Sequence, residues 1–482
     1  MASKSRMPQL GSMYAQQLVV RSYASKPRQG VVNYAMKLMS DPVIETISLA
    51  SRIARILVGS VLVVGSMTFV VWEGAHQYVE HAAMPSTATV DLDTTYDPYG
   101  WDLEDQLHHF GLVSHTDRRL GIFGRHMVRS AWMAEHWGGG IAPQAIFGLA
   151  PRGSTMRQTP DLEAHHGLQL AERFLSTSLH IADAKKIRVE ELNLEDKPLD
   201  WTAVTLEAWL ANLRTKIATP ATLAAAEVGY EKLYDALHAQ PHTEPFCKIL
   251  ATRIGTVQAQ LGQLSQGISW FQRALDKEPS DVINAALADT YMPSSPLDTR
   301  LAVHTLQTLS RGYVLASSQS EAPRAQLYEA LRAQLAALHL LRTEQKRIAQ
   351  SPDATLQQAW TLEAQGEMSV QVAETLYALQ QHPAKHNLLT WWKRDKLLNA
   401  VPQTFGALQT TSKIGRMQMS QAWLQFASER ALSAKAQLSA NNSPQAQLSP
   451  SHRHASERIL RAANLVEEET QLLIRSLEKL QS

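Results

Sequence analysis

The hydrophobic pattern is most distinct near the N-terminus, where residues 56–72 read ILVGSVLVVGSMTFVVW without a charge. Seventeen residues at the helical rise approach the minimum that crosses a hydrocarbon core. The polar side chains in this run are Ser60, Ser66 and Thr68, whose hydroxyls can hydrogen bond back to the helix backbone. We therefore expect a retained transmembrane helix over 56–72. The alternatives are a buried core helix and a membrane segment that only the precursor contains.

From Leu162 onward the chain is rich in Ala, Leu, Gln and Glu and shows no strand-like alternation, which favours helices. Within this part, residues 254–279 read IGTVQAQLGQLSQGISWFQRALDKEP. Small, aromatic and proline residues stand at the spacing of a tetratricopeptide repeat, in the order Gly255, Gly262, Gly267, Phe271, Ala274 and Pro279. In such a helical hairpin, Gly255 and Gly267 allow the two helices to pack closely, and Gly262 ends the first helix.

Two other segments repeat part of this pattern. The second-helix spacing recurs 38 residues upstream, at Gly229, Leu233, Ala236, Leu237 and Pro241. The glycine-to-alanine and alanine-to-proline distances recur 104 residues downstream, at Gly366, Ala378, Leu379 and Pro383. The repeats predict an all-α chain with a tetratricopeptide-like α-solenoid over 161–440, and an irregular helical bundle is the alternative. A solenoid has a concave groove that binds an extended or helical segment of another protein.

The segments on either side of the predicted repeats have other patterns. Residues 84–160 are expected to form a neck, in which a helix over 118–137 buries Leu120, Phe123, Met127 and Ala131 and ends at the glycines that follow. Residues 441–451 are polar and predict a flexible loop. Residues 452–482 contain a heptad seam of Ile459, Ala463, Val466, Leu473, Leu477 and Leu480, with Thr470 filling one place. This helix either caps the last repeat or pairs with a helix of a partner.

The charges before the apolar run indicate a compartment. The first forty residues contain Lys4, Arg6, Arg21, Lys26, Arg28 and Lys37 and no acid, which is typical of a mitochondrial presequence. The order Arg21, Tyr23, Ala24 resembles a processing-peptidase site and predicts a presequence over 1–23. Basic residues precede the apolar run and acids follow it. The positive-inside rule therefore places 24–55 on the matrix side of the inner membrane and the C-terminal part in the intermembrane space.

Composition and motifs favour binding over chemistry. A net charge of +1 carries no nucleic-acid footprint, and the single cysteine, Cys247, is expected to be a core residue. The chain has no Gly-Lys-Ser/Thr phosphate loop, G-x-G-x-x-G, H-E-x-x-H or G-x-S-x-G. The adjacent pairs His108-His109 and His165-His166 are poor chelates, because neighbouring residues on a helix point to different sides. We therefore expect no enzyme activity, no cofactor and no metal site.

The order of presequence, single membrane helix and repeats resembles the tetratricopeptide-repeat adaptor of the fungal mitochondrial i-AAA protease. The resemblance rests on this layout and on residues 220–280, with weaker support as far as Pro383. It implies a non-catalytic inner-membrane adaptor that presents protein substrates to the membrane-bound AAA protease in quality control. The neck over 84–160 does not match the family pattern, and no substrate-contacting residue carries over.

Other functions fit the same layout. One alternative is an assembly factor or structural subunit of a respiratory complex or of the membrane-associated mitochondrial ribosome. An enzyme built on the neck and an outer-membrane import receptor are further alternatives. The import receptor fits less well, because such receptors carry their anchor at the extreme N-terminus without a cleavable leader.

Overall fold

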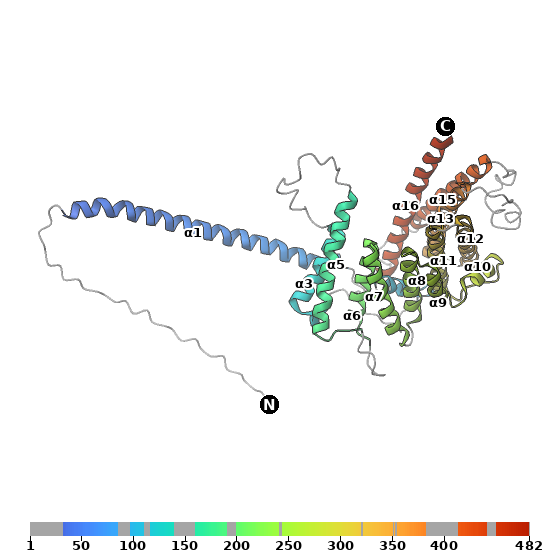
Figure 1. Ribbon diagram of the computed structural model, residues 1–482, viewed down its shortest axis with the longest axis horizontal. Coiled ribbons are helices and arrows are strands. Elements are labelled where there is room, and N and C mark those ends of the chain that lie inside the picture. Colours follow the sequence, from blue (N-terminus) through green and yellow to red (C-terminus); the bar gives the residue numbers. More distant parts are fainter. Residues whose placement is uncertain are drawn as a thin grey trace, which may run out of the picture. The chain divides into compact units, whose positions relative to one another are not determined.

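The computed structural model describes residues 32–84, 97–109, 116–138, 160–189, 199–240, 243–319, 322–349, 351, 354–381, 413–440 and 450–481 (Figure 1). These residues form helices and no strands, which confirms the all-α prediction. The chain divides into two units, Met1–Gly74 and Ala75–Ser482. Several predicted sites lie outside the described residues, namely Arg21, Tyr23 and Ala24 of the presequence, Pro241 and Pro383.

The first unit holds most of α1, which runs through Val32–Tyr78, and a π-helical turn, η1 (Val79–Ala83), follows α1. The second unit contains the other helices: α2 (Trp101–His109), the short 3₁₀ helix η2 (Arg118–Leu120), α3 (Gly121–Trp137), α5 (Pro160–Ala184), α6 (Trp201–Ile217), α7 (Pro220–His238), α8 (Glu244–Gln260), α9 (Leu264–Leu275), α10 (Pro279–Leu287), α11 (Pro296–Ser317), α12 (Pro323–Ile348), α13 (Thr355–Gln381), α15 (Lys413–Ala440) and α16 (Pro450–Gln481).

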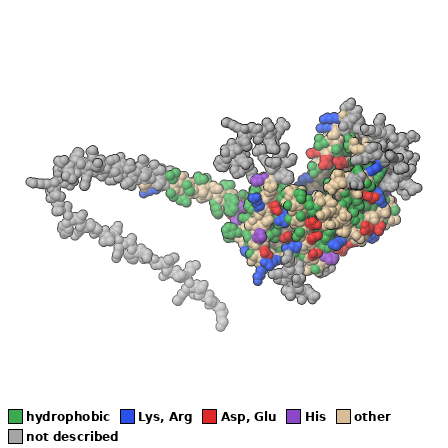
Figure 2. Space-filling view, in the orientation of Figure 1, with side chains coloured by type: hydrophobic (Ala, Val, Ile, Leu, Met, Phe, Trp, Pro, Cys, Tyr) green, Lys and Arg blue, Asp and Glu red, His purple; other side chains and the backbone are tan. Residues whose placement is uncertain are grey.

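The apolar run lies on α1, and its large side chains are exposed (Figure 2). Its hydroxyls bond back to the helix as predicted, at 2.9 Å from Ser60 to Leu57 O, 2.7 Å from Ser66 to Leu62 O and 2.8 Å from Thr68 to Val64 O. By length and composition, the helical stretch Leu57–Ala83, which contains nearly all of the predicted run 56–72, is long and apolar enough to cross a membrane.

Capping and turn residues set where several of the helices begin and end. Asp200 caps α6 by accepting a hydrogen bond from the Thr202 N–H at 3.1 Å, and Thr219 forms a capping box with Thr222 at the start of α7. Gly262 follows α8 with φ +81°, a conformation that glycine adopts without strain. Pro279 is the first residue of α10, where its missing N–H costs no hydrogen bond.

The glycines of the 254–279 pattern lie at the contact between α8 and α9. A Cβ on Gly255 would meet Gly267 O and the Phe271 ring at 3.0 Å, and a Cβ on Gly267 would meet Gly255 O at 2.8 Å. Phe271, Ala274 and Leu233 are buried and Ala236 is partly buried. The upstream copy is looser, because a Cβ on Gly229 would meet Ala211 Cβ of α6 at 3.4 Å.

Gly267→Ala is therefore expected to lower the free energy of unfolding by about 1–3 kcal/mol, the usual cost of overpacking. Gly229→Ala is the matched control at the equivalent place in the preceding hairpin. It should be neutral or stabilising by up to ~1 kcal/mol, because alanine favours the helix and meets only ordinary contact there. Thermal unfolding followed by circular dichroism measures both variants. A loss of the same size for Gly229→Ala would contradict this account of the close contact.

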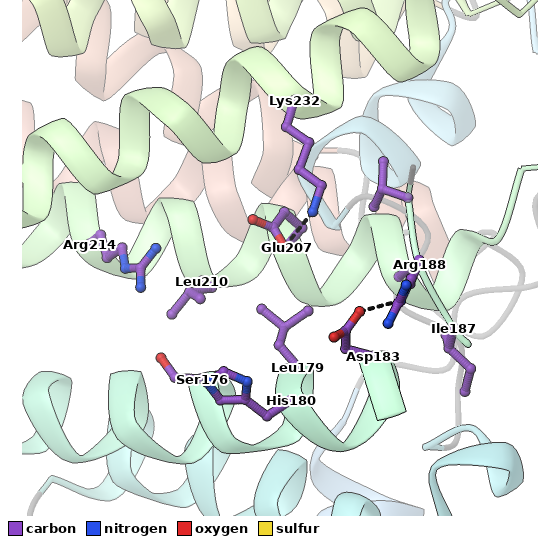
Figure 3. Close-up of a pocket in the computed structure, with 12 residues that line it drawn as sticks. Ser176, Leu179, His180, Asp183, Ile187, Arg188, Glu207, Leu210, Arg214 and Lys232 are labelled. Carbon is purple, nitrogen blue, oxygen red and sulfur yellow. Dashed lines mark ion pairs between the residues drawn. The ribbon is translucent and has the colours of Figure 1, made fainter. Parts of the chain in front are cut away.

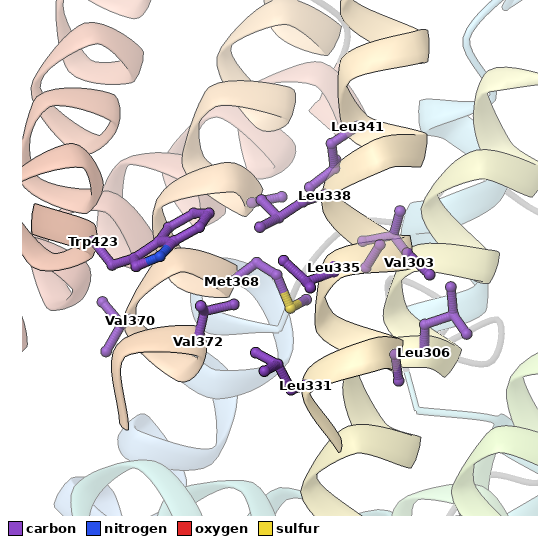
Figure 4. Packing of buried hydrophobic residues seen from close by; sticks show 14 of the residues in the cluster. Val303, Leu306, Leu331, Leu335, Leu338, Leu341, Met368, Val370, Val372 and Trp423 are labelled. Carbon is purple, nitrogen blue, oxygen red and sulfur yellow. The ribbon is translucent and has the colours of Figure 1, made fainter. Parts of the chain in front are cut away.

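The C-terminal helices share a large apolar core (Figure 4). Leucines of α12, including Leu331, Leu335, Leu338 and Leu341, lie between α11 and α13, and Trp423 of α15 closes the far side. Trp423 and Phe426 are both buried. The heptad residues Ile459, Ala463, Val466, Thr470 and Leu477 of α16 are also buried. Because α16 packs on α13 and α15 of the same chain, its seam is covered without a partner helix.

Two sequence predictions need correction here. Gly366 and Ala378 both lie inside the continuous helix α13, so the downstream copy is not a hairpin like α8 and α9. Gly366 instead permits close packing, because a Cβ there would meet Ala427 O of α15 at 3.2 Å. The predicted loop 441–451 is also too long at its end, because α16 already begins at Pro450, a residue that is favourable in the first turn of a helix.

A buried acid in α13 gives the fold a pH dependence. Burial, and then repulsion from Glu367, raise the pKa of the Glu363 carboxyl well above its ordinary value of 4.5. The folded chain therefore binds more protons than the unfolded chain, and stability falls as pH rises from the unfolded pKa through the folded pKa.

Glu363→Gln cannot ionise, so we expect it to raise the free energy of unfolding at pH 7 by roughly 1–2 kcal/mol. The gain should disappear near pH 4, where both states of the wild-type chain hold the proton. Thermal unfolding at the two pH values measures the difference. An equal gain at both pH values would show that charge is not its cause.

The described part of the predicted neck contains α2, η2 and α3, of which α3 packs on α5 while α2 packs on α8 and α16. Leu120 and Ala131 are buried as expected, and Gly138 ends the helix with φ +82°. The prediction for Phe123 is wrong, because its side chain is 77% exposed. The buried residues of α3 are Gly124, Val128, Arg129, Ala131 and Ala134, and the three small ones let α5 approach closely.

Candidate functional site

A short segment of the chain, residues 97–109, lies against four helices that come much later in the sequence. It contacts α8, α11, α13 and α16. Asp97 shapes its start by accepting hydrogen bonds from the N–H groups of Tyr99 and Asp102, both at 2.9 Å. Gly100 has φ +71°, and a Cβ there would meet Leu297 Cβ at 3.1 Å. The segment is therefore fitted closely to this surface, which we call the α2 site. It is formed by Leu297, Arg300, Ser351, Gln357, Ala359, His454, Ala455, Arg458 and Ile459.

Trp101 is the apolar anchor of the segment. Its side chain is 1% exposed and packs with Ala359, Ala455 and Ile459. The Arg300 guanidinium lies over its ring, with 3.9 Å between the guanidinium carbon and the ring centroid. A tryptophan held between alanines and an arginine plane combines a large apolar contact with cation–π attraction.

Arg300 connects the segment to two of the surrounding helices. From α11 its guanidinium donates to the Glu104 carboxylate, to Tyr99 O at 2.7 Å and to Gln357 Oε1 of α13 at 2.6 Å. Burial lowers the pKa of Arg300, while Glu104 acts in the opposite direction. Because the pKa of arginine starts so high, the side chain stays charged and the ion pair with Glu104 persists.

The C-terminal helix completes the α2 site. Arg458 of α16 donates to Glu104 Oε1 at 3.3 Å, and His454 lies 3.3 Å from Asp105 Oδ2. Two acids of the segment therefore meet three basic side chains, from α11 and α16. The α2 site thus holds a helical turn in which a tryptophan is followed three and four positions later by acids.

A second candidate is a pocket of about 380 Å³ between α5, α6 and α7 (Figure 3). Its Lys and Arg side chains each have a carboxylate partner, in the pairs Arg188–Asp183, Lys232–Glu207 and Arg214–Glu172. The charges are therefore largely balanced, and the pocket has no clear preference for an anion. Within the described residues, no group of three or more His, Cys, Asp or Glu is placed to hold a metal ion. Cys247 is buried, as predicted.

Sequence reasoning found the hairpin glycines but missed the α2 site. Gly255, Gly262 and Gly267 lie at helix–helix contacts and turns, not on the surface that binds residues 97–109. In the sequence, Glu104 and Asp105 are two of the acids that follow the apolar run. The signal that was present is a tryptophan beside several acids, Trp101-Asp102-Leu103-Glu104-Asp105, in a segment without basic residues. Comparison with protein-family models, with curated proteins and with solved structures finds no match to this chain.

Proposed function

We propose that this chain is a membrane-anchored helical-repeat scaffold that binds segments of other proteins. The observation that carries the proposal is the α2 site, where a stacked array of helices already binds a short helical segment. Each long helix that touches this segment is the first of a pair or the terminal helix, since α8 pairs with α9, α11 with α12 and α13 with α15. In repeat proteins, such first helices form the inner, concave surface.

The contacts between helices support a tetratricopeptide-like solenoid as the architecture. Contacts run mainly from each helix to its neighbours in the chain, from α5 through α6, α7, α8 and α9 and from α11 through α12 to α13. A quasi-linear array of this kind presents a long surface to a partner. Gly366 inside α13 shows that the last helices depart from the repeat spacing.

As the specific role, we propose a non-catalytic adaptor that presents substrates to a membrane-bound AAA protease from the mitochondrial inner membrane. The basic leader, the helix at Leu57–Ala83 and the helical hairpins support this role. An anchor confines adaptor and protease to one membrane, so a weak binding surface gains effective concentration.

Proximity labelling from an enzyme fused after Ser482 in the full-length chain tests the proposal. We expect the protease and intermembrane-space domains of membrane proteins among the labelled neighbours, and slower turnover of those membrane proteins when the chain is deleted. Labelling of mitochondrial ribosomal proteins or of one respiratory complex, with unchanged turnover, would replace the adaptor with an assembly factor. In mitoplasts, protease should digest the C-terminal part once the outer membrane is opened.

A further inference from the structure

Two large apolar side chains project from the start of α3, where the fold does not use them. Ile122 is 74% and Phe123 is 77% exposed. The buried residues of α3, which packs on α5, are Gly124, Val128, Arg129, Ala131 and Ala134, so neither side chain belongs to the buried face. Exposed apolar side chains placed side by side at the end of a helix point to an interaction surface.

Basic residues surround these two side chains. Arg118 and Arg119 precede them on η2, and the Lys185 ammonium at the end of α5 donates to Arg119 O at 3.1 Å. Lys186 follows, and all four basic side chains are exposed. Figure 2 shows Lys and Arg side chains at the lower left corner of the folded part, where Figure 1 places the ends of α3 and α5. We call this surface the α3 tip, and it consists of Arg118, Arg119, Ile122, Phe123, Lys185 and Lys186.

The acids near the α3 tip each pair with an arginine, and Asp183 of α5, which precedes Lys185, pairs with Arg188. Asp117 and Asp200 both pair with Arg119, with distances of 2.7 Å from its guanidinium nitrogens to each carboxylate. Asp117 also accepts a hydrogen bond from the Thr202 hydroxyl at 2.7 Å. Among the described residues, Arg118 and Lys186 form no ion pair. The tip therefore presents positive charge beside its two apolar side chains.

The α3 tip is also fixed to the chain that leaves the apolar run. Thr116, two residues before the tip, donates from its N–H to Glu80 at 3.1 Å, and Arg125, two residues after it, donates to Glu80 at 2.9 Å. Glu80 follows Trp72, the last residue of the apolar run, by only eight positions. A surface held by so short a connection to a membrane anchor has a high effective concentration of membrane.

We propose that the α3 tip docks on an anionic phospholipid surface, with Ile122 and Phe123 inserted among the lipids and the basic side chains on the phosphates. Apolar side chains next to Lys and Arg are the usual composition of surfaces that enter the membrane interface. Two projecting side chains form a small contact for a protein partner, which typically covers about 20–30 residues. A second contact with the membrane can be smaller than this, because the anchor already holds the chain at the membrane. The proposal requires only that the chain is membrane-anchored, and it is independent of the adaptor role.

The test uses the full-length chain in lipid nanodiscs. Phe123→Cys receives an environment-sensitive fluorophore, which labels it selectively because Cys247 is buried. Val228→Cys on α7 is the matched control, since Val228 is an apolar side chain with 66% exposure. Each protein is reconstituted in discs of phosphatidylcholine alone and in discs where phosphatidylglycerol replaces part of it.

We expect the probe at position 123 to brighten by about twofold or more in the anionic discs, with quenching by lipids brominated on their acyl chains. The probe at position 228 should not change. The added substitutions Lys185→Gln and Lys186→Gln should return the probe at position 123 to its signal in water, and circular dichroism checks that these variants keep their helices. Equal signals in the two kinds of disc would overturn the proposal. So would a probe that stays in water in every disc and responds only when other proteins are added.

Discussion

Glu80→Ala is expected to lower the free energy of unfolding of the second unit by about 3–5 kcal/mol, because it leaves buried positive charge without compensation. The Glu80 side chain is fully buried, and Arg129, almost as deeply buried, donates to its carboxylate at 2.5 Å. Arg125 donates at 2.9 Å, and the Thr116 hydroxyl donates at 2.8 Å. Removing the acid strands Arg129 inside the fold, where water cannot replace the lost partner.

Two further variants isolate the reason for this loss. The exposed pair of Arg461 and Glu457, 3.6 Å apart on α16, is the control, and Arg461→Ala should cost less than about 1 kcal/mol. The double variant Glu80→Leu, Arg129→Met should recover much of the loss, because an apolar pair needs no charge partner. Denaturant unfolding of the full chain in detergent measures all of them. Equal losses for Glu80→Ala and Arg461→Ala would contradict the buried-charge explanation.

Trp101→Ala is expected to cost about 3–5 kcal/mol, the usual range for removing a buried large aromatic side chain. The loss includes the contact with Ala359, Ala455 and Ile459 and the stacking of Arg300 over the ring. Trp137→Ala is the matched control, because Trp137 is 53% exposed and should change stability by less than about 1 kcal/mol.

Hydrogen exchange shows which part of the molecule responds to Trp101→Ala. If residues 97–109 occupy the α2 site as a bound segment, their amides should lose protection while α8, α11 and α13 keep theirs. Uniform loss of protection across all helices would instead make Trp101 an ordinary core residue of the whole unit. That result would remove the main support for the peptide-binding proposal.

Local chemistry explains which parts of this fold the sequence predicts. The α8–α9 hairpin is predictable because its glycines have local effects: Gly262 allows the turn, and Gly255 and Gly267 allow the two neighbouring helices to pack closely. The same glycine-to-alanine spacing misleads at Gly366, because one glycine without other turn signals is tolerated inside a helix. Phe123 misleads for a different reason: helical spacing groups it with Leu120 and Met127, whereas the buried face of α3 includes Gly124 and Val128, one position further along.

The α2 site depends on contacts that no local pattern contains. Glu104 and Arg458 are separated by 354 positions, and Glu104 and Arg300 by 196. Their residue types are common on exposed helix surfaces, and only the tertiary fold brings them together. The identity of Trp101 as an anchor is likewise set by alanines on helices that follow hundreds of residues later.

The long sequence separation between residues 97–109 and α16 also sets an order of events during synthesis. Trp101 emerges from the ribosome long before α16, so its apolar ring has no complete partner surface until α16 is made. Contacts between residues so far apart in the sequence form late and slowly, because the entropy cost of closing the intervening chain comes before the contact energy that offsets it. A chain that ends before Pro450 would therefore keep residues 97–109 uncovered. The completed α2 site thus marks a chain in which α16 has been made and has packed on residues 97–109.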